Sequence, residues 1–192
     1  MSTKYKFRDD SKLYFISFSV IEWIDVFIRN EYKDILIKSF EYCAREKGLE
    51  VYAYCIMTSH VHMIIGTNKN KLEHIIRDLK AHTSTAIRKA IEENPTESRR
   101  EWMLQMMYKA GRENPNNRDF QFWKQDNHPI ELMTNEMLFQ KLQYIHENPR
   151  PYRIGTFGRA VKAGFVRDPH DWLYCSASNY AGMDSIFKVI LV

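Results

Sequence analysis

The sequence predicts an α+β fold in which helices pack on an antiparallel sheet. Short segments rich in aromatic and β-branched residues have the composition of strands, and longer segments carry apolar residues at helical spacing. These segments follow one another in the order β-α-β-β-α, with a further hairpin and a helix after them. A chain of 192 residues is long enough to bury the core of such a domain.

The first half of the chain predicts a strand, a helix and a hairpin. Leu13 to Val20 is a run of aromatic and β-branched residues with partial alternation, which favours a strand. Glu31 to Lys47 has helical apolar spacing, and Gly48 is expected to be its C-cap. Leu49 to Met57 and His60 to Gly66 return to strand composition, separated by a two-residue turn.

The following part of the chain, from Lys71 to Asn148, predicts three helices. Lys71 to Ile91 carries an apolar seam along its length. Asn94-Pro95-Thr96-Glu97 has the pattern of a capped helix start, so a helix is expected from there to Gly111. The aromatic stretch Phe120 to Trp123 belongs to the expected further hairpin. Thr134 is expected to cap a last helix that ends near Asn148, ahead of a proline.

Composition is typical of a globular protein in a reducing compartment. Hydrophobic residues make up 44% of the chain and charged residues 27%, with a net charge of +4. Cys43, Cys55 and Cys175 are odd in number and widely spaced, which predicts buried free thiols and no zinc knuckle. No secretory h-region or membrane span is present, so we expect a cytoplasmic protein. We expect a single domain over 1–192, with a core over 1–149 and a basic C-terminal extension over 150–192.

His60 and His62 stand one residue apart at the start of a predicted strand. Side chains of a strand alternate between its faces, so both imidazoles are expected to project from the same face. Two imidazoles placed in this way can converge on one metal ion or one phosphate. The motif alone is weak, because a histidine pair with this spacing is common by chance.

The end of the last predicted helix carries a second group of polar side chains. Lys141, Tyr144 and Asn148 lie at i, i+3 and i+7, on a face next to the buried stripe. Tyrosine can act as a nucleophile, and the asparagine amide can be a neutral oxygen ligand. The alternative is a half-buried packing tyrosine followed by a C-terminal capping asparagine. His146 points to a different face, and we interpret it as structural.

Several motifs resemble those of a known family. His60-Val61-His62 is similar to the histidine-hydrophobic-histidine (HUH) signature of single-strand DNA endonucleases. Tyr144 to Pro149 (YIHENP), then VKAGFV at 161–166 and WLYCSASNY at 172–180, resemble REP-associated tyrosine transposases, which are relatives of the single-tyrosine, IS200-like insertion-sequence transposases. The similarity extends in the same order from Leu13 to Tyr180. It implies a palm-like antiparallel sheet of the ferredoxin or RRM type.

The resemblance implies a role for each residue that matches the motifs. His60 and His62 would be metal ligands, Asn148 would occupy the third ligand position, and Tyr144 would be the nucleophile. The implied cofactor is a divalent metal, Mg or Mn, although the preferences of imidazole ligands favour zinc or manganese. The sequence departs from the family by eleven residues inserted over 150–160, directly after Asn148, and by a cysteine at 175 in place of serine.

Basic residues with interleaved aromatic rings predict contacts to a nucleic-acid backbone and its bases. On the helix predicted over Lys71 to Ile91, Arg77, Lys80 and Arg88 form a basic line, for which a solvated charged face is an equally good interpretation. The predicted DNA-binding residues are Arg77, Lys80, Arg88, Lys141, Arg150, Tyr152, Arg153, Arg159, Lys162 and Arg167. The resemblance implies single-stranded or hairpin DNA as the partner. The apolar pattern predicts no membrane contact, and the sequence leaves a homodimer and a monomer open.

Three functional hypotheses follow from these residues. The leading one is a metal-dependent single-strand DNA endonuclease and strand transferase that acts on hairpin-forming repeats through a 5′-phosphotyrosine intermediate. The second is a catalytically lapsed nucleic-acid-binding protein of the same fold. The third, a metal hydrolase with a histidine-bound water, gives Tyr144 no role.

Overall fold

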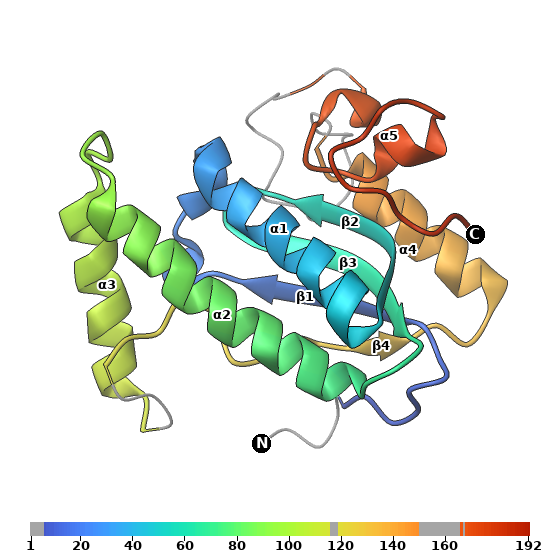
Figure 1. The fold of residues 1–192 in the computed structure, drawn as a ribbon, viewed down its shortest axis with the longest axis horizontal. Coiled ribbons are helices and arrows are strands. Elements are labelled where there is room, and N and C mark those ends of the chain that lie inside the picture. The colour runs from blue at the N-terminus through green and yellow to red at the C-terminus, as the bar shows by residue number, and fades with distance from the viewer. Residues whose placement is uncertain (1–5, 116–118, 150–165, 167) are drawn as a thin grey trace, which may run out of the picture.

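The fold is a four-stranded antiparallel sheet with helices on both faces (Figure 1). The computed structural model describes residues 6–115, 119–149, 166 and 168–192. The strands are β1 (Tyr14–Ser19), β2 (Leu49–Ile56), β3 (His60–Thr67) and β4 (Ile130–Glu131), in the order β2-β3-β1-β4. The helices are α1 (Asn30–Lys47), α2 (Leu72–Glu93), α3 (Arg100–Glu113), α4 (Asn135–Glu147) and α5 (Ala177–Tyr180), with 3-10 turns η1 (Ile21–Trp23), η2 (Val26–Ile28) and η4 (Pro169–Asp171).

The predicted fold class is confirmed. The chain order β1-α1-β2-β3-α2-β4 places the first and third strands at the centre of the sheet, which is the ferredoxin-like arrangement. The two central strands pair antiparallel, with His62 opposite Ser17. The edge strand β4 has only two residues and pairs with Tyr14 and Phe15 of β1.

Two of the three predicted helix caps are present. Gly48 adopts the left-handed conformation with φ 76° and ends α1, and its backbone N–H donates to the carbonyl of Cys43. The Thr134 side chain accepts a hydrogen bond of 3.2 Å from the backbone N–H of Met137 and begins α4. The sequence signals at these two helix ends were therefore sufficient to locate them.

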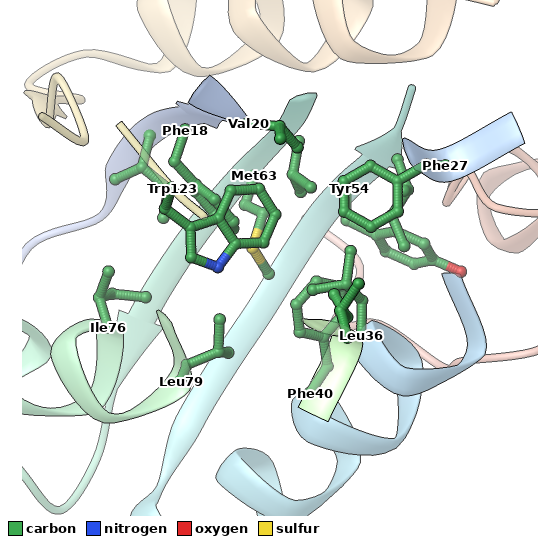
Figure 2. Packing of buried hydrophobic residues seen from close by; sticks show 14 of the residues in the cluster. Phe18, Val20, Phe27, Leu36, Phe40, Tyr54, Met63, Ile76, Leu79 and Trp123 are labelled. Atoms are coloured by element: carbon green, nitrogen blue, oxygen red, sulfur yellow. The ribbon is translucent and has the colours of Figure 1, made fainter. Parts of the chain in front are cut away.

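The sheet separates two apolar cores according to the alternation of side chains along its strands. Val61, Met63 and Ile65 of β3 face α1 and α2, where they join a large cluster that Trp123 helps to fill (Figure 2). Ile64 of the same strand faces the other way, into a smaller cluster beneath α4. The helices α1 and α2 thus cover one face, and α4 covers the other (Figure 1).

The predicted start of the third helix is wrong. The helix begins at Arg100, because Asn94 and Glu97 are used in other contacts. The Asn94 side chain accepts the backbone N–H of Thr96 and closes a local turn. Glu97 is buried and accepts hydrogen bonds from Arg29 and Arg99, so its carboxylate ties two distant segments together and caps no helix.

Gly111 does not end α3, which continues to Glu113. A Cβ atom at Gly111 would lie 2.3 Å from Cα of Phe120, so glycine is needed here for a close approach between helix and chain. The expected further hairpin is also not formed in the described part of the chain. Within 120–123, Trp123 makes one isolated bridge with Val20, and the strand that follows is the short β4.

The C-terminal residues 168–192 pack against the edge strand β2. The backbone N–H of Ser176 donates to the carbonyl of Tyr54, and Ile190 N–H donates to the carbonyl of Val51, both at 2.9 Å. Tyr174 contributes to the large core beside α1. The three cysteines are free and buried, as predicted. Among the described residues, no helix combines the length and apolarity needed to cross a membrane.

Candidate functional site

The two histidines lie on the α4 side of β3, at the end where the strand begins. Their ring centroids are 4.8 Å apart, with an interplanar angle of 77°. The strand is paired on both sides, with Ser17 and Cys55 opposite His62. Since hydrogen bonds on both edges fix the backbone, the sheet holds both imidazoles in one place, as the spacing predicted.

Burial keeps both imidazoles neutral at pH 7. It lowers the pKa of His60 to about 4. The pKa of His62 is lowered to about 3, mostly by burial and to a smaller extent by the neighbouring His60 and Lys141. His60 Nδ1 lies 3.3 Å from the Ser59 hydroxyl. His62 Nδ1 is buried and has no hydrogen-bond partner among the described residues.

Tyr144 projects from α4 against this histidine pair. Its ring centroid lies 5.2 Å from that of His62 in an edge-to-face contact, and 5.9 Å from the ring of Phe15. The adjacent residues Leu142 and Ile145 are buried in the smaller core and seat the helix on the sheet. The Tyr144 side chain remains 49% exposed, so the phenol is both next to the histidines and accessible from solvent.

Lys141 lies one turn before Tyr144 and brings a positive charge to the same place. Its ammonium nitrogen is 4.8 Å from the Phe15 ring centroid and 5.7 Å from that of Tyr144. Phe15 also stacks on His62, with centroids 5.7 Å apart. Phe15 was not predicted from the sequence; the alternation of β1 and its pairing with β3 are the signals that could have identified it.

Asn148 follows the last residue of α4, and its backbone is still helical. Its Nδ2 donates to the carbonyl of Tyr144 at 3.4 Å. His146 points away from the site: its Nε2 is 3.0 Å from Ser176 Oγ, and its ring packs on Tyr180. These contacts anchor the end of α4 to the C-terminal segment, as expected for a structural histidine.

The predicted basic line on α2 lies on the other face of the sheet. The ammonium of Lys80 donates to the carbonyl of Lys124 and to Asn127 Oδ1, and burial lowers its pKa to about 8. Arg88 pairs with Glu92 and donates to the Tyr108 hydroxyl. Arg77 is 66% exposed and pairs with the adjacent aspartate. The structure therefore does not bring these cations to the histidines.

Six other predicted DNA-binding residues fall outside the described part of the chain, as does the insertion at 150–160. They are Arg150, Tyr152, Arg153, Arg159, Lys162 and Arg167. Among the described residues, one group of acidic and imidazole side chains was not anticipated. Donor atoms of Asp168, His170 and Asp171 lie within 4.8 Å of one another, and Asp168 and Asp171 form the capping box of η4.

The residues on the α4 face are suited to hold a divalent cation. A neutral imidazole offers a nitrogen lone pair, and burial keeps both His60 and His62 in that form. The unpartnered His62 Nδ1 indicates that this ring makes few hydrogen bonds within the protein. A set of two imidazoles, with an amide oxygen as a third donor, leaves coordination positions open for substrate.

Comparisons with known proteins identify relatives of the chain. The family described as "Transposase IS200 like" matches residues 18–118, about half of the chain. A structure titled a REP-associated tyrosine transposase bound to a REP hairpin aligns with 99% of this chain and 92% of its own, at 14% identity and a TM-score of 0.62. A putative transposase from Deinococcus radiodurans R1 aligns with 77% of this chain and 95% of its own, at 16% identity and a TM-score of 0.42. No curated protein matched significantly.

Proposed function

Because the chain belongs to the IS200-like transposase family, we propose that it is a metal-dependent single-strand DNA endonuclease and strand transferase. Tyr144 is the proposed nucleophile, and hairpin-forming repeat DNA is the proposed substrate. The hairpin is supported by the structural relative, whose title names a REP hairpin as its bound partner. We further propose that the whole chain acts as one unit, with 150–192 as a basic extension of the core.

The observation that carries the proposal is the contact between two segments distant in sequence. The Tyr144 ring lies 5.2 Å from His62, and His60 lies 4.8 Å beyond it on the same strand face. A packing tyrosine would be buried among apolar residues, whereas this ring is half exposed beside two neutral imidazoles and a lysine. The arrangement supplies a nucleophile, candidate ligands and a positive charge within one site.

The proposed reaction is a transesterification at phosphorus. The Tyr144 oxygen bonds to the phosphorus, the bond from phosphorus to the 3′ oxygen breaks, and that oxygen leaves as a free 3′-hydroxyl after taking up a proton. The phenol proton passes to solvent, to which the exposed side chain has access. A later attack by a 3′-hydroxyl on the phosphotyrosine reverses these bonds, so strands can be rejoined without a nucleotide cofactor.

His60, His62 and Asn148 are the proposed ligands of the cation. A bound Mg²⁺ or Mn²⁺ would neutralise charge on the non-bridging oxygens and polarise the phosphate. On α4, Lys141 lies over the Phe15 ring. Tyr144, one turn later, contacts both Phe15 and His62, so each turn of the helix lies closer to the histidines than the turn before it. We expect the next turn to carry the Asn148 side chain in the same direction.

Lys141 is proposed to contact the DNA backbone next to the reacting phosphate. Its ammonium lies among the rings of Phe15 and Tyr144, and no described carboxylate forms an ion pair with it. A cation in this position stabilises negative charge on the phosphate and on the attacking oxygen.

The test uses a labelled hairpin with single-stranded flanks, Mn²⁺ and the purified protein. We expect a protein–DNA adduct that survives SDS, and its loss in Tyr144→Phe, which keeps the ring and its packing but lacks the nucleophilic oxygen. Tyr42→Phe, at an exposed tyrosine on α1, is the matched control and should leave the adduct unchanged. An adduct that persists in Tyr144→Phe would refute the nucleophile assignment. Hairpin binding by wild type without cleavage would support the lapsed binding protein instead.

A further inference from the structure

An exposed tryptophan lies at the edge of the proposed catalytic site. Trp23 belongs to the turn η1, and 57% of its surface is accessible. Its ring packs edge to face with His60, with centroids 5.5 Å apart. Exposed aromatic rings can stack on nucleic-acid bases, and this one lies against a residue of the proposed site, so it is a candidate contact for the substrate.

The backbone at Trp23 is held in an unfavourable conformation. Glu22 and Trp23 both have positive φ angles, 49° and 56°, which are rare for bulky residues. The residues on either side, Ile21 and Ile24, are buried, and the Ile21 N–H donates to the carbonyl of Phe122. These anchors fix the turn and leave only its two strained residues exposed. Surrounding structure therefore maintains the outward position of the indole.

A lysine accompanies the indole. Nζ of Lys124 lies 4.8 Å from the Trp23 ring centroid, and the Lys124 backbone N–H donates to the carbonyl of Ser19 at the end of β1. Among the described residues, no carboxylate forms an ion pair with this ammonium. In contrast, the ammonium of Lys80 is buried against the carbonyl of the same Lys124.

We propose that Trp23 and Lys124 form a nucleotide-binding platform for the single strand that flanks the scissile phosphate. A base stacks on the exposed surface of the indole, and Lys124 neutralises the adjoining phosphate. Single-strand binding sites combine these two elements, and stacking on an aromatic ring tolerates any base. The inference rests on the proposed function, because contact with His60 places the platform next to the reacting phosphate. The cation favours a polyanionic occupant over an apolar protein surface.

The test measures binding in the Tyr144→Phe background without divalent metal, so that no cleavage takes place. The probes are oligodeoxythymidine and an oligomer of the same length that lacks bases, both at low ionic strength. Trp23→Gly is the main variant, because glycine readily adopts the positive φ of this position. We expect it to bind oligodeoxythymidine about tenfold more weakly, with unchanged affinity for the baseless strand. Trp23→Phe should restore most of the affinity, and Trp102→Ala, at an exposed tryptophan on α3, should have no effect.

Photo-crosslinking locates the contact directly. An oligodeoxythymidine that contains 5-iodouracil should crosslink to Trp23 in the Tyr144→Phe protein, as read by mass spectrometry of the peptides. Equal affinity of Trp23→Gly and its parent for oligodeoxythymidine, or crosslinks that map only to other segments, would overturn the platform. If the platform fails while wild type still forms the Tyr144 adduct, the proposed function stands. If crosslinks map to Trp23 while no adduct ever forms, Trp23 still binds single-stranded DNA, but the proposed function fails.

Discussion

The two faces of the sheet differ in what they bury. The face beneath α1 and α2 is closed over a large apolar cluster. The face beneath α4 has a smaller cluster, and at its edge two neutral imidazoles, a half-exposed phenol and a lysine replace apolar side chains. The strand β3 contributes to both faces, because Val61 and Met63 face the large core while His60 and His62 face α4. The sheet thus separates the residues that stabilise the fold from those proposed to carry the chemistry.

The basic side chains on the two faces of the sheet also differ in their contacts. Lys80 and Arg88 of α2 are engaged within the protein on the first face, whereas Lys141 of α4 lies at the site on the second. A basic line on a helix is therefore not evidence of a nucleic-acid surface until the contacts of each side chain are known. Neighbouring residues of β3, such as His62 and Met63, face opposite sides of the sheet, so single substitutions can test the two faces separately.

The largest difference is expected between substitutions of His62 and of Met63, in their effects on adduct formation and on stability. His62→Phe keeps a ring in this buried position but offers no ligand nitrogen, so it should reduce adduct formation by orders of magnitude and change the free energy of unfolding less than Met63→Ala does. Met63→Ala should cost about 2–5 kcal/mol of stability through the cavity it creates, while the folded fraction stays active. Denaturant unfolding and the SDS-resistant adduct assay measure the two quantities. A large loss of both in either variant would show that the faces are not independent.

Substitution of Glu97 tests how much a buried charged contact stabilises the fold. Its carboxylate is 4% exposed and bonds to Arg29 and Arg99, so Glu97→Ala should cost about 1–3 kcal/mol by removing these hydrogen bonds. Arg29 keeps Glu31 and Arg99 keeps Asp25 as a second partner. Glu93→Ala, at an exposed position on α2, is the control and should cost less than about 1 kcal/mol. Unaltered unfolding of Glu97→Ala would contradict this role.

The same carboxylate predicts a pH dependence. Burial raises the pKa of Glu97, but hydrogen bonds from Arg99 and the charges of both arginines outweigh it, so the pKa is lower than the usual 4.5. The unfolded chain then binds more protons than the folded one in acid. The contribution of Glu97 is therefore complete above pH 4.5 and is lost as the pH falls through its lowered folded value. Glu97→Gln should flatten this part of the stability profile, and an unchanged profile would assign the acid sensitivity to other groups.

Gly111 tests the packing of α3 on the chain that follows it. Gly111→Ala would place a methyl group against the backbone of Phe120, and we expect a loss of about 1–3 kcal/mol. Thermal unfolding measures this loss. Ala110→Gly, at the neighbouring helical position, should cost only about 1 kcal/mol through helix propensity. Stabilisation by Gly111→Ala would show that the two segments can separate without penalty.

The smallest expected effect compares cations on the two faces. In the Tyr144→Phe background, Lys141→Ala should weaken hairpin binding a few-fold and reduce the salt slope by about one unit. Arg77→Ala removes an exposed cation from the opposite face and should change neither quantity. Titrations at several salt concentrations give both values. Equal losses in the two variants would mean that DNA contacts both faces.

The spacing of apolar and polar residues along strands and helices predicted most of the features that could be inferred from the sequence alone. Alternation along β3 was enough to place His60 and His62 on one face, and helical spacing was enough to place Lys141 and Tyr144 together. The contact between the two groups depends on how α4 packs on the sheet, which no local pattern contains. It was anticipated because the family resemblance joined the two motifs.

The failures of sequence reasoning involve side chains whose tertiary partners outweigh local signals. Asn94 and Glu97 match a capping box, but their hydrogen bonds form a local turn and a distant ion pair. Gly111 resembles a helix stop, yet it serves a close approach to Phe120. Trp23 matches no motif, because its exposure depends on buried neighbours and on the backbone conformation of a turn.

The anchoring of α4 to the C-terminal segment has a consequence for engineering. His146 at the end of α4 meets Ser176, and Trp172 Nε1 donates to the carbonyl of Ile56 in β2, so the two ends of the intervening stretch are tethered to the same strand edge. These contacts should therefore keep Tyr144 in register when the sequence between Pro149 and Asp168 is altered.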